Sequence, residues 1–181
     1  AAISDIDLFI KSEEEVNLEQ DDVTTHNVSA DTDNTERMEE IPTVDGAVLG
    51  IDVSSWNKEI DWDSVKAAGV KFAIIRCGFR GYTSGSLVED KYFRQNILEA
   101  NEAGIQVGVY FFTQAISEVE AVEEASMAIT LCRDYNLTYP VFIDTEGTGG
   151  NGRAGGLDKA TRTLVCDAFC KTMENAGYRS G

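Results

Sequence analysis

The chain has 181 residues, of which 43% are hydrophobic, and this is enough for one domain with a buried core. Its formal net charge is −17, and residues 1–46 hold 14 of the 32 acidic and 2 of the 15 basic residues. Nucleic-acid phosphates require a basic surface, so this charge argues against a nucleic-acid partner. No apolar run of about 18 residues predicts a membrane span, and no secretion signal is visible at the N-terminus.

Residues 1–45 are predicted to be an acidic, disordered linker or tail, because they combine runs of acids with few large apolar residues. A short exception is the stretch IDLFI at residues 6–10, which could dock on another surface. The only histidine, His26, lies in this tail. Its position excludes histidine-based catalysis within the domain that follows.

From residue 46 to residue 181 the pattern alternates between apolar strands and amphipathic helices. Such alternation indicates a parallel sheet covered by helices, either as an open doubly wound sheet or as a β/α barrel. Both architectures place ligand sites at the carboxyl ends of the strands. The predicted strands are 47–53, 71–76, 105–111 and 139–144, and the predicted helices are 61–68, 90–103, 117–135 and 157–176.

Local signals support these helices. Ser117 and Glu120 match a capping box at the start of the third helix. Glycines follow the helices where left-handed backbone can end them. The second helix is expected to bury Phe93, Ile97 and Ala100, and the last helix to bury Ala160, Leu164, Ala168 and Phe169.

The four cysteines, Cys77, Cys132, Cys166 and Cys170, lack the spacing of a zinc site or a disulfide scaffold. We expect ordinary buried thiols at all four positions. No metal and no cofactor is predicted.

The most informative stretch is YPVFIDTEGTGG at residues 139–150, in which a buried strand runs into Asp144 and Glu146. Because strand side chains alternate, these two carboxylates are expected on the same face. One interpretation is that the strand ends there and both acids are solvated. The other is an active site, since Asp52, Arg76 and Tyr110 are also expected at the carboxyl ends of predicted strands.

A competing hypothesis comes from the same region. Gly147, Gly149 and Gly152 form a G-x-G-x-x-G pattern between a strand and a helix, which is the context of a dinucleotide-binding loop. Two acids before the glycines would repel a pyrophosphate, and this strand is the fourth rather than the first. A nucleotide-binding α/β protein is nevertheless kept as the alternative prediction, because the glycine pattern lies in the right context.

Several spaced motifs resemble glycoside hydrolase family 25, the Chalaropsis-type lysozymes or N-acetylmuramidases. The motifs are GIDVSSWNKEIDWDSVKAAGVKFAIIRCGFRG at residues 50–81, DKYFRQNILEANEAGIQVGVYFFTQA at residues 90–115, and PVFIDTE at residues 140–146. The resemblance is collinear over most of residues 50–181. It implies a β/α barrel of which about the first four β/α units are present here, so residues 46–181 would be the N-terminal part of the hydrolase domain.

The resemblance also implies hydrolysis of the β-1,4 bond between N-acetylmuramic acid and N-acetylglucosamine in peptidoglycan. Carried over by motif, Glu146 is the general acid, Asp144 its partner carboxylate and Asp52 a third acid. The strand-end pair could have a retaining or an inverting separation, and the 2-acetamido group of the substrate could also act as nucleophile. The pattern leaves this stereochemistry open.

Aromatic side chains suit a sugar site, because sugars stack on their faces. The candidate substrate-binding residues are Tyr110, Phe79 and Trp56, together with Arg76. Tyr82 is a further loop aromatic, whereas Trp62 is expected in the core. Arg76 is expected either to contact a carboxylate of the site or to form a strand-end ion pair. Peptidoglycan strands are the expected partner, and a secreted or cell-wall location is expected. A non-catalytic peptidoglycan-binding module is the third hypothesis.

Overall fold

The computed structural model describes residues 47–147 and 151–181. The predictions for the acidic tail, for the stretch at residues 6–10 and for His26 lie outside the described residues. The same holds for Gly149 of the glycine-rich loop. All seven candidate site residues are described.

Four parallel strands form the centre of the domain, in the order β1 (Gly50–Val53), β2 (Phe72–Arg80), β4 (Gln106–Phe112) and β5 (Val141–Asp144). A short strand, β3 (Leu87–Glu89), pairs antiparallel with the end of β2. Spatial order follows chain order, whereas a doubly wound sheet reverses its order at a switch point. The doubly wound alternative is therefore wrong, and the order is that of consecutive strands in a β/α barrel.

The described strands do not close into a barrel, because β1 and β5 lie at opposite ends of the strand order. In the described part of the chain, the sheet continues beyond β5 through Ser180 and Gly181. Ser180 forms a parallel bridge with Val141, and the Ile143 amide donates to the carbonyl of Gly181 at 2.9 Å. The expected parallel α/β architecture is confirmed, while a closed barrel is not part of this structure.

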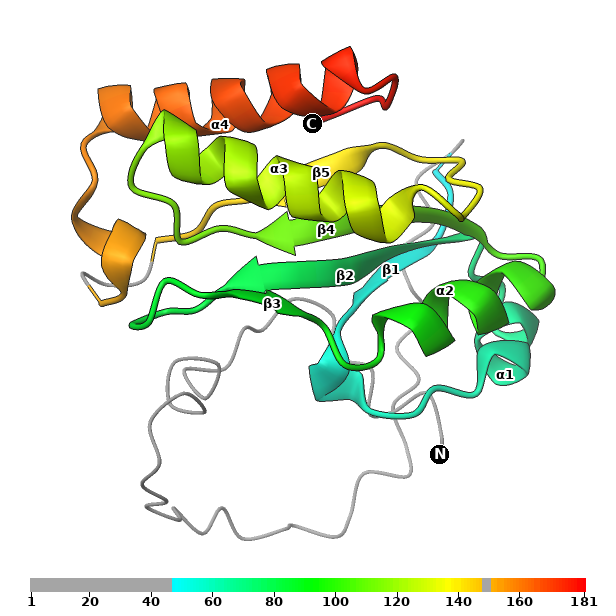
Figure 1. Cartoon of the computed structure of the whole chain (residues 1–181). Coiled ribbons are helices and arrows are strands. Elements are labelled where there is room, and N and C mark those ends of the chain that lie inside the picture. The colour runs from blue at the N-terminus through cyan, green and yellow to red at the C-terminus, as the bar shows by residue number, and fades with distance from the viewer. Residues whose placement is uncertain (1–46, 148–150) are drawn as a thin grey trace, which may run out of the picture.

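The helices are α1 (Trp62–Ala67), α2 (Phe93–Glu102), α3 (Glu118–Cys132) and α4 (Lys159–Asn175), and two 3-10 turns, η3 (Ser55–Asn57) and η4 (Arg153–Gly156), lie in loops. Figure 1 shows α3 and α4 side by side over the β4 and β5 side of the sheet, with α1 and α2 toward the other end. The predicted helices are each one to three residues too long at their ends. None of the helices in the described ranges has the length and hydrophobicity to cross a membrane.

The two faces of the sheet differ in chemistry. Val107, Val109 and Phe111 alternate along β4 and are fully buried in the core with Val141 of β5. Strand alternation therefore directs the residues between them to the opposite face. The cross-strand pairs Arg76–Tyr110–Phe142 and Phe79–Phe112–Asp144 follow the register of β2, β4 and β5.

The strand β2 ends four residues later than predicted, since Gly78 and Phe79 near its end are paired on both sides. Gly78 and Phe79 pair with β3 as well as with β4, and Arg80 pairs with β3. The β2–β3 hairpin was not predicted, because LVE is too short and too mixed in polarity to show a strand period.

The apolar face of α4 differs from the prediction. Val165, Phe169 and Met173, spaced four residues apart, are buried, whereas Leu164 is 49% exposed and Ala160 is exposed. Phe169 was predicted correctly, and the stripe is rotated by about one residue from the expected one. In α2, the predicted burial of Phe93, Ile97 and Ala100 is confirmed, as is that of Trp62 in α1.

All four cysteines are free thiols. Cys77 and Cys132 are buried as predicted, but Cys166 and Cys170 are only partly buried, so the prediction was wrong for this pair. Burial raises the pKa of the Cys77 thiol well above 9.0. Its Sγ donates to the carbonyl oxygen of Tyr110 at 3.3 Å, and this thiol is held in the protonated, unreactive form.

The buried side chains of α4 predict which shortened side chains destabilise the domain. Phe169→Ala should destabilise the domain by about 3 to 5 kcal/mol, because it leaves a cavity in the core. Leu164→Ala, one turn earlier on the exposed face, should change stability by less than about 0.5 kcal/mol. Urea unfolding of the two variants measures this difference, and equal losses would contradict the buried stripe.

Candidate active site

The carboxylates of the D-T-E motif lie where β5 ends. Asp144 is the last residue of β5 and pairs with Phe112 of β4. Its carbonyl oxygen accepts a hydrogen bond from the Thr113 amide at 3.0 Å, which continues the ladder to the strand end. Asp144 and Glu146 are both partly buried rather than fully exposed. The interpretation that both acids are simply solvated is therefore weakened.

Asp52 lies in β1, at the other edge of the parallel sheet. It pairs with Ile74 of β2, and its side chain is exposed, whereas its neighbours Ile51 and Val53 are buried. Strand alternation therefore turns Asp52 away from the core. Following the register across β2 and β4, the row of Asp52 reaches β5 four residues before Asp144.

Arg76 forms an ion pair, which was one of its two expected roles, although it lies in the middle of β2 and not at its end. Its side chain is almost fully buried, and its Nε donates to Asp90 Oδ2 at 2.9 Å. A second nitrogen donates to Ser55 Oγ at 3.0 Å, and the Ser55 amide donates to the same Asp90 oxygen at 2.9 Å. The guanidinium thus ties β2 to the turn after β1 and to the segment before α2.

The aromatic candidates are divided among three settings. Tyr110 is partly buried in β4, in the same cross-strand row as Phe142. Trp56 lies in η3 and is partly buried, directly after β1. Phe79 belongs to β2 and not to a loop as predicted, and the Arg76 guanidinium lies 5.1 Å from its ring centroid.

Tyr82 lies in a turn directly after β2, as predicted, but its side chain is buried and does not face an open site. It packs beneath Gly152, where an added Cβ would lie 2.7 Å from its ring and 2.6 Å from Gln114 Oε1. Gly152 also has a φ of +71°, which favours glycine. This glycine therefore serves backbone conformation and close packing rather than phosphate binding.

The start of α4 also argues against the nucleotide-binding hypothesis. A dinucleotide loop leads directly into a helix whose free N-terminal amides bind the pyrophosphate. Here η4 intervenes, and the Asp158 carboxylate caps α4 by accepting from the Thr161 amide at 2.8 Å. The amide hydrogen bond lowers the pKa of Asp158, so a negative charge already occupies this helix end.

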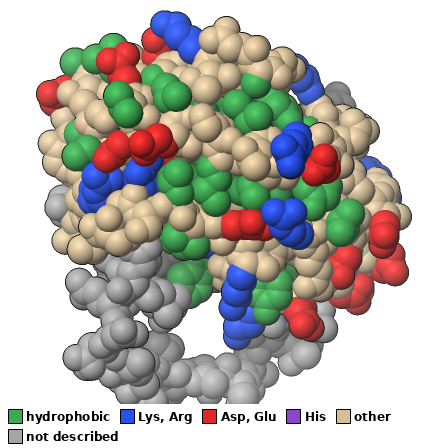
Figure 2. All heavy atoms as spheres, viewed as in Figure 1, with side chains coloured by type: hydrophobic (Ala, Val, Ile, Leu, Met, Phe, Trp, Pro, Cys, Tyr) green, Lys and Arg blue, Asp and Glu red, His purple; other side chains and the backbone are tan. Residues whose placement is uncertain are grey.

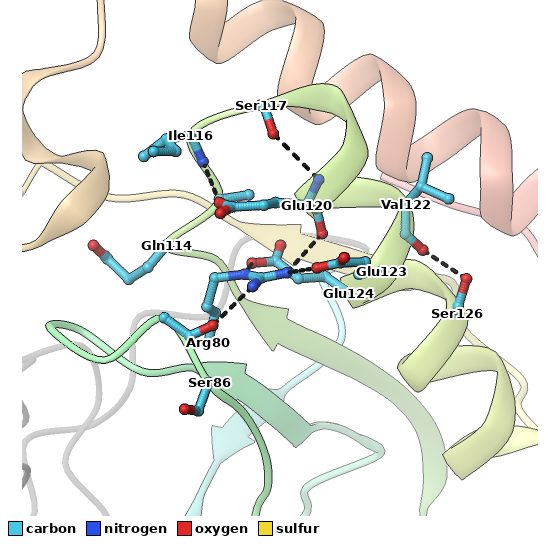
Figure 3. Close-up of polar contacts among 12 residues, drawn as sticks. Arg80, Ser86, Gln114, Ile116, Ser117, Glu120, Val122, Glu123, Glu124 and Ser126 are labelled. Carbon is cyan, nitrogen blue, oxygen red and sulfur yellow. Dashed lines mark hydrogen bonds and ion pairs between the residues drawn. The ribbon is translucent and has the colours of Figure 1, made fainter.

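A buried charge network was not predicted from the sequence. Figure 3 shows the Arg80 guanidinium surrounded by the first turns of α3. Its Nε donates to Glu124 Oε1 at 2.8 Å, and a terminal nitrogen donates to the Glu120 carbonyl at 2.9 Å and to Glu123 Oε2 at 3.0 Å. A further bond goes to the carbonyl of Gly85 at 2.8 Å. Arg80 therefore joins the β2–β3 turn to the N-terminus of α3.

Glu124 is fully buried, and within the described part of the chain its Oε2 has no hydrogen-bond partner. Burial raises the pKa of this carboxyl group, and Arg80 opposes the rise. Glu124 is the second residue of the sequence EEA (residues 123–125) in an acidic helix, and this local sequence does not indicate burial. Only the position of Arg80 in the folded sheet reveals the pair.

A second ion pair holds the loop that follows the acidic motif. Arg153 of η4 contacts both oxygens of Glu120, at 2.7 and 3.1 Å, and its guanidinium lowers the pKa of that carboxyl group. Gln114 Oε1 accepts from the Ala154 amide at 3.1 Å. The predicted capping box is half formed, because Ser117 accepts from the Glu120 amide while Glu120 binds the Ile116 amide instead of Ser117.

A separate groove of about 790 Å³ runs between β3, α2 and α3. Exposed apolar side chains of α3, including Val119 and Val122, contribute to it, and Figure 2 shows hydrophobic side chains gathered on this face among charged ones. None of the seven candidate site residues lines this groove. In the described ranges, no group of three or more histidine, cysteine or acidic side chains is arranged to hold a metal ion.

Comparison with known proteins identifies related chains. The family model described as "Glycosyl hydrolases family 25" matches residues 51–181. Lysozyme M1 from Streptomyces globisporus is 35% identical over 130 residues, which cover 70% of this chain and 42% of the lysozyme. The chain thus spans less than half the length of this curated relative.

Solved structures agree with this relationship. The modular autolysin LytC from Streptococcus pneumoniae, in complex with a synthetic peptidoglycan ligand, superimposes with a TM-score of 0.65 at 30% identity, covering 76% of this chain and 32% of that chain. The bacterial lysozyme from Streptomyces coelicolor superimposes with a TM-score of 0.56 at 26% identity, covering 72% of this chain and 59% of that chain.

Removal of Arg80 should leave the buried carboxylate of Glu124 without its guanidinium partner. Arg80→Met is expected to destabilise the domain by about 3 to 5 kcal/mol at pH 7, because it leaves an unpaired buried carboxylate. The variant raises the pKa of Glu124 further above its ordinary value. The native variant then holds the proton of Glu124 to a higher pH than the native wild type does, so the deficit grows as pH rises through the raised pKa of Glu124 in the wild type and shrinks as pH falls below it.

Urea unfolding at pH 4 and pH 7 measures this dependence. The matched control is Arg94→Met, since Arg94 pairs with Glu89 at the surface and such pairs contribute less than about 1 kcal/mol. A deficit of Arg80→Met that is the same at both pH values would show that Glu124 carries no charge in the native state.

Proposed function

Because the chain belongs to glycosyl hydrolase family 25, we propose that it is part of a lysozyme-type muramidase. The proposed reaction is hydrolysis of the β-1,4 bond between N-acetylmuramic acid and N-acetylglucosamine in peptidoglycan. The observation that carries the proposal is the position of the D-T-E motif. Asp144 closes β5 on the face opposite the core, within the region that matches the family.

In this proposal Glu146 is the general acid that protonates the oxygen of the leaving sugar, and Asp144 is its partner carboxylate. Glycoside hydrolysis requires one protonated and one ionised carboxyl group. A neighbouring negative charge raises the pKa of the acid, because two like charges at close range cannot both ionise freely.

Asp52 joins this site only if the sheet is tilted and curved as in a barrel. In a flat sheet three strand spacings, about 14 Å, would separate β1 from β5. A barrel of eight strands staggers its neighbours by about one residue each. Three such steps would carry the row of Asp52 from residue 140 to within about one residue of Asp144. The third-acid role of Asp52 therefore depends on barrel curvature.

The substrate-binding residues are assigned by position. Tyr110 shares the open face of the sheet with Asp144, and Trp56 and Phe79 lie at the carboxyl ends of β1 and β2. We assign them to stacking against sugar rings. The side chain of Arg76 is nearly fully buried, so its part is to hold Asp90 and the turn at Ser55 rather than to contact sugar.

The partner and the location follow from the reaction. The complex of LytC with a synthetic peptidoglycan ligand supports peptidoglycan glycan strands as the substrate. Peptidoglycan lies outside the cell membrane, so we assign the protein to the cell exterior or the cell wall.

The stereochemistry of the proposed reaction stays open. The Cα atoms of residues i and i+2 of a strand lie about 6.6 Å apart, so their carboxyl groups can have either the separation of about 5 Å for retention or that of about 9 Å for inversion. Attack by the 2-acetamido group of the substrate also stays within the proposal.

Replacement of the proposed acid tests the function. Glu146→Gln in the full-length protein should lower the lysis of bacterial cell walls at least about a hundredfold, since general acids contribute at this level. Turbidity loss of a wall suspension measures the rate. The matched control is Glu102→Gln, an exposed residue at the end of α2, which should lyse like the wild type.

The same preparations separate the three hypotheses. Lysis by Glu146→Gln at the wild-type rate would reject Glu146 as the acid. Wall binding without lysis by the wild type would favour a non-catalytic binding module. Calorimetric titration with NAD tests the nucleotide hypothesis, and heat of binding that is lost on substitution of Gly152 would support it.

A further inference from the structure

Within the described residues, Arg162 of α4 forms side-chain hydrogen bonds that reach the acidic motif. Its NH1 group donates to Thr145 Oγ1 at 2.7 Å, and its NH2 group donates to the carbonyl oxygen of Ala154 at 3.0 Å. Thr145 is the residue between Asp144 and Glu146. The two nitrogens of one planar guanidinium thus join the motif to the loop that follows it.

The direction of this contact is informative. Val141 is fully buried and Ile143 packs against the core, so the core side of β5 is the side of its odd-numbered residues. The next odd-numbered residue is Thr145, and its hydroxyl binds a residue of α4, which packs against β5. Asp144 lies on the opposite face. In an extended chain, holding Thr145 on the helix side also turns Glu146 to the face of Asp144.

The far end of the contact is anchored independently. Ala154 is buried, and its amide donates to Gln114 Oε1 at 3.1 Å. The neighbouring Arg153 is paired with Glu120, and its amide donates to the Tyr82 carbonyl at 3.2 Å. Arg162 therefore connects Thr145 to a loop that is already bonded to the segments after β2 and β4 and to α3.

We propose that Arg162 is a positioning residue, which holds Thr145 so that the two flanking carboxylates point together into the sugar site. Arg162 does not contact the reacting atoms in this proposal. The inference rests on the proposed muramidase function. Its physical basis is that a misplacement of about 1 Å in a reacting group can lower a rate about a hundredfold.

The test uses Arg162→Met, Thr145→Val and the double variant in the full-length protein. Each single variant should lower kcat about ten- to a hundredfold, while KM for soluble peptidoglycan fragments stays within about threefold, because positioning acts on the reacting groups. The double variant should be no slower than the slower single variant, since both changes remove one contact. Arg162→Lys should restore part of kcat through a single bond to Thr145.

Matched controls make the same substitutions elsewhere. Arg133→Met replaces an exposed arginine after α3, and Thr163→Val removes a hydroxyl that binds only its own helix at Lys159. Both should keep the wild-type kcat. Thermal melting of every variant shows whether a loss of rate follows a loss of folded protein.

A second readout does not need activity. Carboxyl 13C NMR titration reports the pKa of Glu146 directly, and this pKa should move in Arg162→Met and Thr145→Val but not in the controls. Wild-type kcat, or an unmoved Glu146 pKa, in folded Arg162→Met and Thr145→Val overturns the inference. If the wild type fails to lyse walls while the Glu146 pKa still moves, the proposed function fails and the positioning role stands.

Discussion

The parallel register between β4 and β5 is the constraint on which the rest of the structure depends. It places Val141 and Ile143 in the core and so directs Asp144 to the opposite face, next to Phe112. The strand can hold this orientation to its last residue because its ladder is completed there, by the Thr113 amide on the Asp144 carbonyl. Without that final bond the two acids would belong to a loop, and strand alternation would not decide where Asp144 points.

Beyond the strand ends, arginine side chains hold the loops in place, as the backbone hydrogen bonds hold the strands within the sheet. Arg76 fixes the turn after β1, Arg80 fixes the β2–β3 turn to α3, Arg153 fixes η4 to Glu120, and Arg162 fixes Thr145 to Ala154. Each guanidinium binds two or more partners from different segments, which lysine could not do with the same geometry. The loops at the carboxyl ends of the strands are thus held by ionic and polar contacts, whereas the core below them is apolar. This division leaves the carboxyl end of the sheet polar enough for a sugar ligand.

The resemblance to family 25 lysozymes and the physical interpretation of the site are independent arguments that meet at the same residues. The family relationship rests on spaced motifs across residues 51–181. The physical argument rests on strand alternation, partial burial and like-charge repulsion at Asp144 and Glu146. The position of Asp52 links the two, because its place at the far edge of the sheet suits a catalytic role only in a curved, staggered sheet. The four parallel strands follow one another in chain order, as consecutive strands of such a sheet would.

The sequence by itself determined the four strands, the four helices and their alternation, because apolar runs and helical periods are local properties of the chain. It also placed the acids at strand ends. It could not reveal the β2–β3 hairpin, because β3 is too short to show a strand period. The rotated stripe of α4 depends on which side its neighbours pack, and the pairing of Arg80 with Glu124 joins residues 44 positions apart. The choice between a doubly wound sheet and barrel order was likewise decided by tertiary structure. Both folds share the same local periods and differ only in which strands hydrogen-bond to each other.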